Sequence, residues 1–242
     1  MRFLALALLA VTPLVASAQG GKLLANRHGD VAFQRAGIGA RNPLAQSAQV
    51  NLGDSDVAIT GKQSLAAVTL PDSTQVLVGS ETRVQLAFFN QAATTKAKFI
   101  VGRGRIRFEV HHPSGARADY TFQTPTSSLA VRGTEGDLEV DPSGTIRVNV
   151  YKLSNPDLPV SVTTANGKTY EIAAGHSLFA HVVNGVVQVE VGKLTQELVD
   201  RFSGDFGVPT NWAQLKQTLI QKAVQKLPPP PNLPVSIPFP PR

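Results

Sequence analysis

The chain contains no cysteine. This absence excludes disulfide bonds, thiolate metal sites, a cysteine nucleophile and the lipidated cysteine that follows the signal of a bacterial lipoprotein. Long apolar runs are also missing beyond the N-terminus, since no later segment approaches the roughly 18 apolar residues of a transmembrane helix. Stability must come from packing alone. The chain has 242 residues, of which 42% are hydrophobic, enough for one sizeable domain or two small ones.

The N-terminus has the pattern of a secretory signal peptide, residues 1–18. Arg2 precedes an apolar run from Phe3 to Val15, and Ala16-Ser17-Ala18 is the small-x-small pattern that signal peptidase needs. We expect a periplasmic or secreted product with no stable transmembrane segment. Cleavage of the signal removes Arg2, one of the 23 Lys and Arg residues. The remaining 22 basic and 17 acidic residues give the mature chain a net charge of about +5. Nucleic acid is not expected as a partner of an exported chain.

Residues 19–193 are predicted to form an all-β domain. Short alternating runs over residues 28–191 are separated by Gly, Pro, Asn and Asp, which is typical of strands with frequent turns. Three turns predict hairpins: Asp141–Gly144, Asn166–Gly167 and Asn184–Gly185. The expected fold is a set of short stacked antiparallel strands. Both a solenoid-like stack and a closed roll fit this pattern.

The composition changes after Gly192, and residues 194–227 are predicted to be helical. Apolar residues recur there at three- to four-residue spacing, which indicates two amphipathic helices broken near Gly204 to Pro209. The stripe consists of Leu194, Leu198, Phe202, Trp212, Leu215, Leu219 and Val224. We expect this stripe to pack on the β domain, with a partner surface as the alternative. Residues 228–242 form a proline-rich tail, expected to be an extended terminus or a ligand for an aromatic groove.

Catalytic patterns are weak in this sequence. The five histidines do not occur at spacings that converge on one point, so no metal site is expected. Two carboxylate pairs, Asp54 with Asp56 and Glu135 with Asp137, lie two residues apart and would share a strand face. They are the candidate acid and base of an envelope polysaccharide or peptidoglycan hydrolase.

Three arginines, Arg103, Arg105 and Arg107, alternate along a predicted strand and would project from one face. Such a ladder could bind a carboxylate- or phosphate-rich polymer through bidentate hydrogen bonds. The alternative is a solvated strand face that discourages pairing at a sheet edge.

The stretch SSLAVRGTEGDLEV, residues 127–140, places Arg132-Gly133-Thr134-Glu135 inside what otherwise reads as one strand. It belongs to an ordered series: NLGD and VAITGKQSLA within residues 51–66, LPDSTQV at 70–76, Thr124-Pro125, AVRGTE at 130–135, then Leu138 to Val150. This series resembles the FecR domain, the periplasmic part of iron-dicitrate-type sensor proteins, over roughly residues 28–180. The resemblance implies an all-β domain without catalytic residues or cofactor.

On this resemblance, residues 132–135 are a structural signature, with a binding role as the alternative. Gly133 would permit a tight backbone, while Arg132 and Glu135 would satisfy buried polar groups or one another. Two positions depart from the family pattern: Ser73 replaces the glycine of an Asp-Gly-Ser turn, and Gly136 replaces an aromatic residue. Signal-transducing members carry a cytoplasmic anti-sigma region and a membrane span ahead of this domain, so direct sigma-factor control is not expected here.

These observations predict an exported, non-enzymatic FecR-domain protein that acts as a binding or scaffolding module in the cell envelope. The hydrolase and a polyanion-binding protein are the alternatives. The expected contact surfaces are the face with Arg103, Arg105 and Arg107 and the segment Thr195–Arg242. The partner, an envelope protein or an anionic polymer, is left open by the sequence, as are the oligomeric state and any part in signalling.

Overall fold

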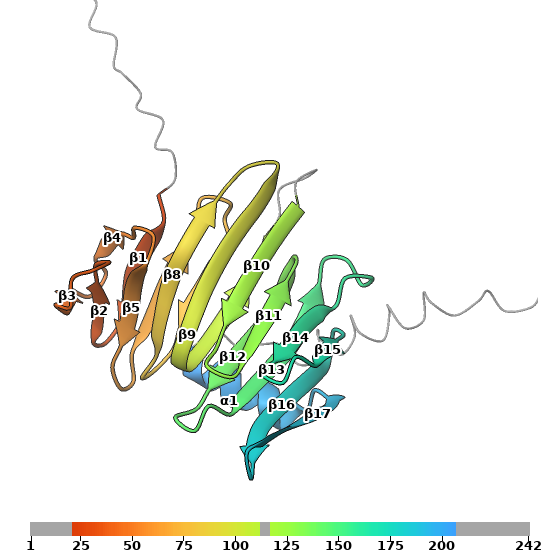
Figure 1. Ribbon diagram of the computed structural model, residues 1–242. Coiled ribbons are helices and arrows are strands. Elements are labelled where there is room, and N and C mark those ends of the chain that lie inside the picture. Colours follow the sequence, from red (N-terminus) through yellow and green to blue (C-terminus); the bar gives the residue numbers. More distant parts are fainter. Residues whose placement is uncertain (1–20, 112–116, 207–242) are drawn as a thin grey trace, which may run out of the picture.

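The computed structural model describes residues 21–111 and 117–206, which form two stacked β layers and one helix (Figure 1). Sheet A contains, in spatial order, β4 (Gln49–Asn51), β1 (Leu23–His28), β6 (Leu65–Thr69), β7 (Gln75–Val78), the second half of β9 (Thr94–Glu109), β12 (Thr134–Val140), β13 (Ile146–Leu153), β16 (His176–Val183) and β17 (Val186–Lys193). Sheet B contains β3 (Asn42–Leu44), β2 (Val31–Gln34), β5 (Asp56–Thr60), β8 (Arg83–Asn90), the first half of β9, β10 (Arg117–Gln123), β11 (Ser127–Val131), β14 (Val160–Thr164) and β15 (Thr169–Ile172).

The chain builds this stack by making a hairpin in one layer and then crossing to the other. The hairpins β12–β13 and β16–β17 lie in sheet A, while β10–β11 and β14–β15 lie in sheet B. The strands remain open at both ends, so the closed-roll alternative is wrong. The prediction of short antiparallel strands is also too simple, because β9 is 16 residues long and runs parallel to β10.

Strand β9 passes from one layer to the other at Gly104. Up to Arg103 it pairs with β8 in sheet B, and from Gly104 it pairs with β12 in sheet A. Gly104 has a φ of 97°, which side chains with a Cβ rarely adopt. A Cβ at this position would also lie 2.5 Å from the Cα of Thr82. This crossing therefore depends on glycine.

The apolar core lies between the two layers, as the alternation of side chains in the strands predicts. Phe108 of sheet A stacks on Phe122 of sheet B with 4.8 Å between ring centroids, and Phe99 stacks on the same ring at 5.3 Å. Contacts of this kind hold the layers together without directional bonds.

Alternation along residues 146–150 and 187–191 predicts that Val148, Val150 and Val191 lie in the core. Val148 and Val150 are fully buried, but Val191 is 47% exposed, so the prediction is wrong at that position.

The three predicted turns do connect paired strands. Asp141–Gly144 joins β12 to β13, Asn166–Gly167 joins β14 to β15, and Asn184–Gly185 joins β16 to β17. Asn184 and Gly185 both have positive φ, 50° and 77°, as a type I′ turn requires. At the Asn166 turn only Gly167 has a positive φ, so that hairpin uses a different turn from the one its sequence suggests.

The helix α1 (Gln196–Phe206) packs on the outer face of sheet A. Leu194 and Phe202 of the predicted stripe are buried, as is Val199, which the stripe did not include, whereas Leu198 is only partly buried. The helix continues through Gly204 to Phe206, beyond the start of its predicted break. The signal peptide, the second predicted helix and the proline-rich tail lie outside the described residues. Within the part of the chain that the structure describes, no helix has the length and apolarity needed to cross a membrane.

Candidate functional site

A buried charged cluster lies between sheet A and α1. Arg107 on β9 donates from Nε to Oδ1 of Asp137 on β12 over 2.7 Å, and from Nη2 to Oδ2 over 3.2 Å. Tyr151 on β13 donates its hydroxyl proton to the same carboxylate. Asp137 is fully buried and Arg107 is 5% exposed. Burial and the charge of Asp137 raise the pKa of the Tyr151 hydroxyl, so the tyrosine stays a donor.

Aromatic rings of α1 and a second ion pair complete this surface. The guanidinium of Arg107 lies 5.2 Å from the centre of the Phe206 ring, and that of Arg105 lies 5.7 Å from the centre of Phe202. Arg105 also donates to Glu139 over 2.7 Å, and Arg201 of α1 donates to the same carboxylate over 2.7 Å. The helix is thus attached through cation–π contacts and a shared glutamate.

The predicted ladder of three exposed arginines does not exist in this form. Arg105 and Arg107 lie beneath α1, paired with Glu139 and Asp137. Arg103 precedes the bend at Gly104, lies in the sheet B half of β9 and is exposed. The expectation failed because it assumed one regular strand, whereas the bend and the docked helix separate the three side chains.

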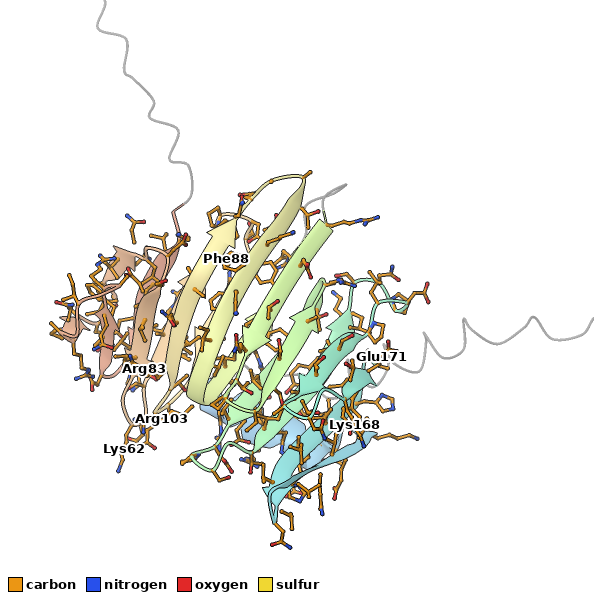
Figure 2. All side chains as sticks on the ribbon, viewed as in Figure 1. Lys62, Arg83, Phe88, Arg103, Lys168 and Glu171 are labelled. Carbon is orange, nitrogen blue, oxygen red and sulfur yellow. The ribbon has the colours of Figure 1, made fainter. Side chains whose placement is uncertain are left out.

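Arg103 instead belongs to a basic corner formed with Lys62 and Arg83. Arg83 on β8 lies directly opposite Arg103, and Figure 2 shows Lys62 at the same end of the molecule. Lys62 is held there by the turn it belongs to, since Glu81 donates its N–H to Gly61 over 2.9 Å. Glu81 itself is exposed in this corner. Among the described residues, no carboxylate lies within ion-pair distance of Lys62, Arg83 or Arg103.

The stretch Arg132-Gly133-Thr134-Glu135 is the corner at which the chain crosses from β11 in sheet B to β12 in sheet A. Gly133 has a φ of 64°, and its carbonyl accepts the N–H of Ser154 over 2.7 Å. Thr134 is buried, and its carbonyl accepts the N–H of Val110 over 2.9 Å. These backbone hydrogen bonds join the corner to the ends of β13 and β9, and the structural role that the family resemblance implies for Arg132 and Glu135 stays a prediction.

The two charged residues of this corner do not pair with each other. Arg132 lies 3.7 Å from Asp119 of β10. Glu135 lies opposite Glu109 of β9, and both line a cavity of about 170 Å³ together with Gln75, Leu77 and Arg107. Burial, with a smaller contribution from the charge of Glu109, raises the pKa of Glu135. Two like charges across a strand pair are destabilising when both are ionised.

The four candidate hydrolase carboxylates lie in different surroundings. Asp54 is exposed and pairs with Lys22, while Asp56 is buried beside Arg35 at 2.6 Å. Burial opposes ionisation of Asp56, but hydrogen bonds from the N–H groups of Gly53 and Ala36 and from Arg35 outweigh it and lower the pKa.

The second carboxylate pair is divided as well, because Asp137 is bound to Arg107 and Tyr151 while Glu135 lines the cavity. Neither pair supplies two carboxyl groups facing one cleft, as glycoside chemistry needs. The described residues also contain no group of three His, Asp or Glu side chains suited to a metal ion.

The two departures from the family pattern have local consequences. Ser73 adopts a φ of 68°, a left-handed conformation that costs a residue with a Cβ roughly 1 kcal/mol or more. At Gly136, a Cβ would lie 2.9 Å from the ring of Phe108 and 2.5 Å from the carbonyl oxygen of Asn149. The Phe108 ring therefore occupies the space beside Gly136, and no larger side chain fits there without rearrangement.

Sequence reasoning missed the pairing of Arg107 with Asp137. Two features of the sequence could have indicated it. Both residues lie in strands with alternating apolar and polar residues, and the apolar stripe of α1 needs a face of the sheet to pack on. The sequence separation of 30 residues and the unknown strand order concealed the pairing. The partners of Arg105 were concealed in the same way, because one of them lies on the strand neighbour β12 and the other on α1.

Residues 56–152, from the start of β5 into β13, match the family described as FecR protein. The chain contains a FecR domain. The matched range includes the corner at residues 132–135 and both members of the buried Arg107–Asp137 pair. The stack described here continues beyond the FecR match on both sides, through β1 to β4 and through β14 to β17.

Two solved structures of a candidate anti-sigma factor from Parabacteroides distasonis ATCC 8503 are similar to this chain. Their identities are 15% and 16%, both TM-scores are 0.48, and both cover 61% of this chain. The chain spans 65% and 64% of their lengths, just under two thirds. No curated protein matches the chain.

Proposed function

We propose that this chain is an exported FecR-domain protein that acts as a binding or scaffolding module in the cell envelope and has no catalytic activity. The FecR match and the signal-peptide pattern of residues 1–18 support this proposal. The observation that carries it is the set of partners that bind the candidate carboxylates. Of the four candidate acid and base residues, Asp56 and Asp137 are paired with arginines and Asp54 with Lys22, and only Glu135 lines a cavity, so neither candidate pair supplies two free carboxyl groups.

The basic corner favours a second candidate function, the binding of an anionic envelope polymer. Arg83 and Arg103 lie directly opposite each other although like charges across strands are unfavourable. A phosphate- or carboxylate-bearing ligand would offset this repulsion and accept hydrogen bonds from both guanidinium groups. The corner replaces the arginine ladder as the surface for this function.

Crosslinking affinity purification from intact envelopes tests both proposals. The full-length chain is compared with a Lys62→Ala/Arg83→Ala/Arg103→Ala variant. A variant with Arg27→Ala, Arg117→Ala and Lys168→Ala is the matched control, because it loses the same charge at exposed positions elsewhere. A defined protein partner retained by all three proteins supports the scaffold. Recovery of polymer alone, lost only with the basic corner and weakened steeply by salt, supports polyanion binding instead.

Incubation with purified peptidoglycan and envelope polysaccharide tests the absence of catalysis. We expect no release of soluble fragments. Turnover that disappears in a Glu135→Gln variant of undiminished melting temperature would overturn the non-enzymatic proposal. The wild-type melting curve is the reference, because a variant that loses turnover by unfolding carries no information about chemistry.

A further inference from the structure

The two ends of the stack differ in how their edge strands are protected. At the N-terminal end, β3 and β4 have three residues each, and β3 contains Pro43, which has no N–H to offer a new strand. At the C-terminal end, β15 has four residues. The charged Glu171 lies within it and the charged Lys168 directly precedes it (Figure 2). These three edges are short, and those of β3 and β15 also carry a residue that discourages pairing.

The β17 edge, Val186–Lys193, is longer than the other three, and its charged residues, Glu190 and Lys193, lie in its second half. It has eight residues and, within residues 21–111 and 117–206, pairs only with β16. Its sequence VVQVEVGK contains four valines, of which Val186 is 60% exposed and Val191 is 47% exposed. A long, apolar, unpaired edge strand is a template for another strand.

The register of the hairpin shows which backbone groups of β17 face outward. Leu194 donates its N–H to the carbonyl of Gly175 over 2.8 Å, so residues 175 and 194 form a hydrogen-bonded pair. Such pairs alternate along an antiparallel ladder, so residues 188, 190 and 192 bond to β16. The N–H and C=O groups of Val187, Val189 and Val191 therefore point toward the free edge.

A second β17 is complementary to this edge. In an antiparallel pair centred on Val189, the Val187 of one copy faces Val191 of the other, and Val189 faces itself. The valines, of which Val187 and Val189 already pack on the core, would then form one continuous apolar row. On the opposite face, Glu190 faces Gln188, so no like charges meet. A pair centred on Glu190 would instead place two glutamates together.

We propose that this chain forms a twofold symmetric dimer through antiparallel pairing of the β17 edge with that of a second copy, centred on Val189. Sheet A then continues across two molecules. This proposal does not depend on the function proposed above, since a dimer can form whichever ligand the module binds.

The absence of cysteine allows a direct test of the register. In the proposed dimer, Gln188 of one copy and Glu190 of the other form a non-hydrogen-bonded pair, with Cα atoms at about 4.5 Å, within disulfide range. Full-length Gln188→Cys and Glu190→Cys proteins are prepared separately and mixed under oxidising conditions. We expect a disulfide-linked dimer in the mixture and none in either protein alone.

Sedimentation velocity over a range of concentrations gives the second readout. Val191→Lys should abolish the dimer, because it places a charge in the valine row. Phe88→Lys on β8 is the control, since Phe88 has a similar exposure, 40%, but lies in sheet B, away from β17. Retention of the dimer is expected there.

Three outcomes would overturn the proposal. The first is a wild-type protein that stays monomeric at all concentrations and gives no mixed disulfide, as expected if residues 207–242 or another protein cover the edge. The second is a dimer that is insensitive to Val191→Lys, which would use another surface. The third is a dimer in which Glu190→Cys links to itself, which would place the centre elsewhere.

Discussion

Around the second half of β9, the two faces of sheet A are covered by different chemistry. On β9, Ile106 and Phe108 face sheet B and pack among apolar side chains, whereas Arg105 and Arg107 face α1 and are paired with carboxylates. The inner face gains stability from apolar area, which changes gradually with side-chain size. The outer face depends on complete pairing of charges, since one unpaired buried charge is costly. Neighbouring residues of one strand should therefore respond very differently to small changes.

The largest expected effect is at the outer face. Asp137→Asn removes the charge that compensates the buried guanidinium of Arg107, and breaking such a pair costs roughly 3–5 kcal/mol. Urea denaturation should show this loss in the free energy of unfolding. If Asp137→Asn lowers the free energy of unfolding by less than the apolar substitution Ile106→Val on the inner face, the comparison is contradicted.

The double variant Arg107→Met/Asp137→Leu sharpens the same point. It removes both charges and keeps apolar volume beneath α1, so it should recover much of the stability lost in Asp137→Asn. If the double variant is as unstable as the single one, the cluster contributes through specific hydrogen bonds, such as that from Tyr151, and not through charge compensation.

A smaller effect is expected at the inner face. Ile106→Val removes one methylene group from a fully buried side chain and should cost about 0.5–1.5 kcal/mol. The same urea titration measures it. A loss as large as that of Asp137→Asn would show that the inner face is as intolerant as the outer one.

The smallest effect concerns Glu135, which lines the small cavity with Glu109 and Arg107. Its pKa is raised in the folded protein, mainly by burial and then by Glu109, so ionisation destabilises the fold as pH rises through the folded pKa. Glu135→Gln should raise the free energy of unfolding at pH 7 by roughly 0.2–1 kcal/mol, the scale of a cross-strand pair. This advantage should disappear near pH 4, below the ordinary pKa of about 4.3. An equal gain at both pH values would mean that charge is not the cause.

Local signals predicted much of the fold. The three turn sequences located their hairpins, and alternation correctly assigned Val148 and Val150 to the core but wrongly assigned Val191. The stripe containing Leu194 and Phe202 correctly predicted a helix docked on the β domain. Each of these signals lies within a few residues, and its physical cause, a turn conformation or a buried face, is equally local.

Pairings between distant residues could not be predicted in this way. Alternation alone suggested that Arg103, Arg105 and Arg107 share a face, because nothing in the sequence GRGRIR distinguishes a regular strand from one bent at Gly104. The partners of Arg105 and Arg107 lie on β12, β13 and α1, whose order in space depends on the whole stack. The basic corner with Arg83 was missed for the same reason.

The passage of β9 through both layers has a mechanical consequence. In a sandwich held only by apolar packing, one layer can slide over or peel from the other without any covalent resistance. Here one strand, β9, joins the two layers at Gly104 near the middle of the stack. Its first half is paired with β8 and β10 in sheet B, and its second half with β7 and β12 in sheet A. Under a shearing force, separation of the layers would have to break hydrogen bonds of β9 in both sheets at the same time. The domain should therefore unfold in one abrupt event rather than in steps.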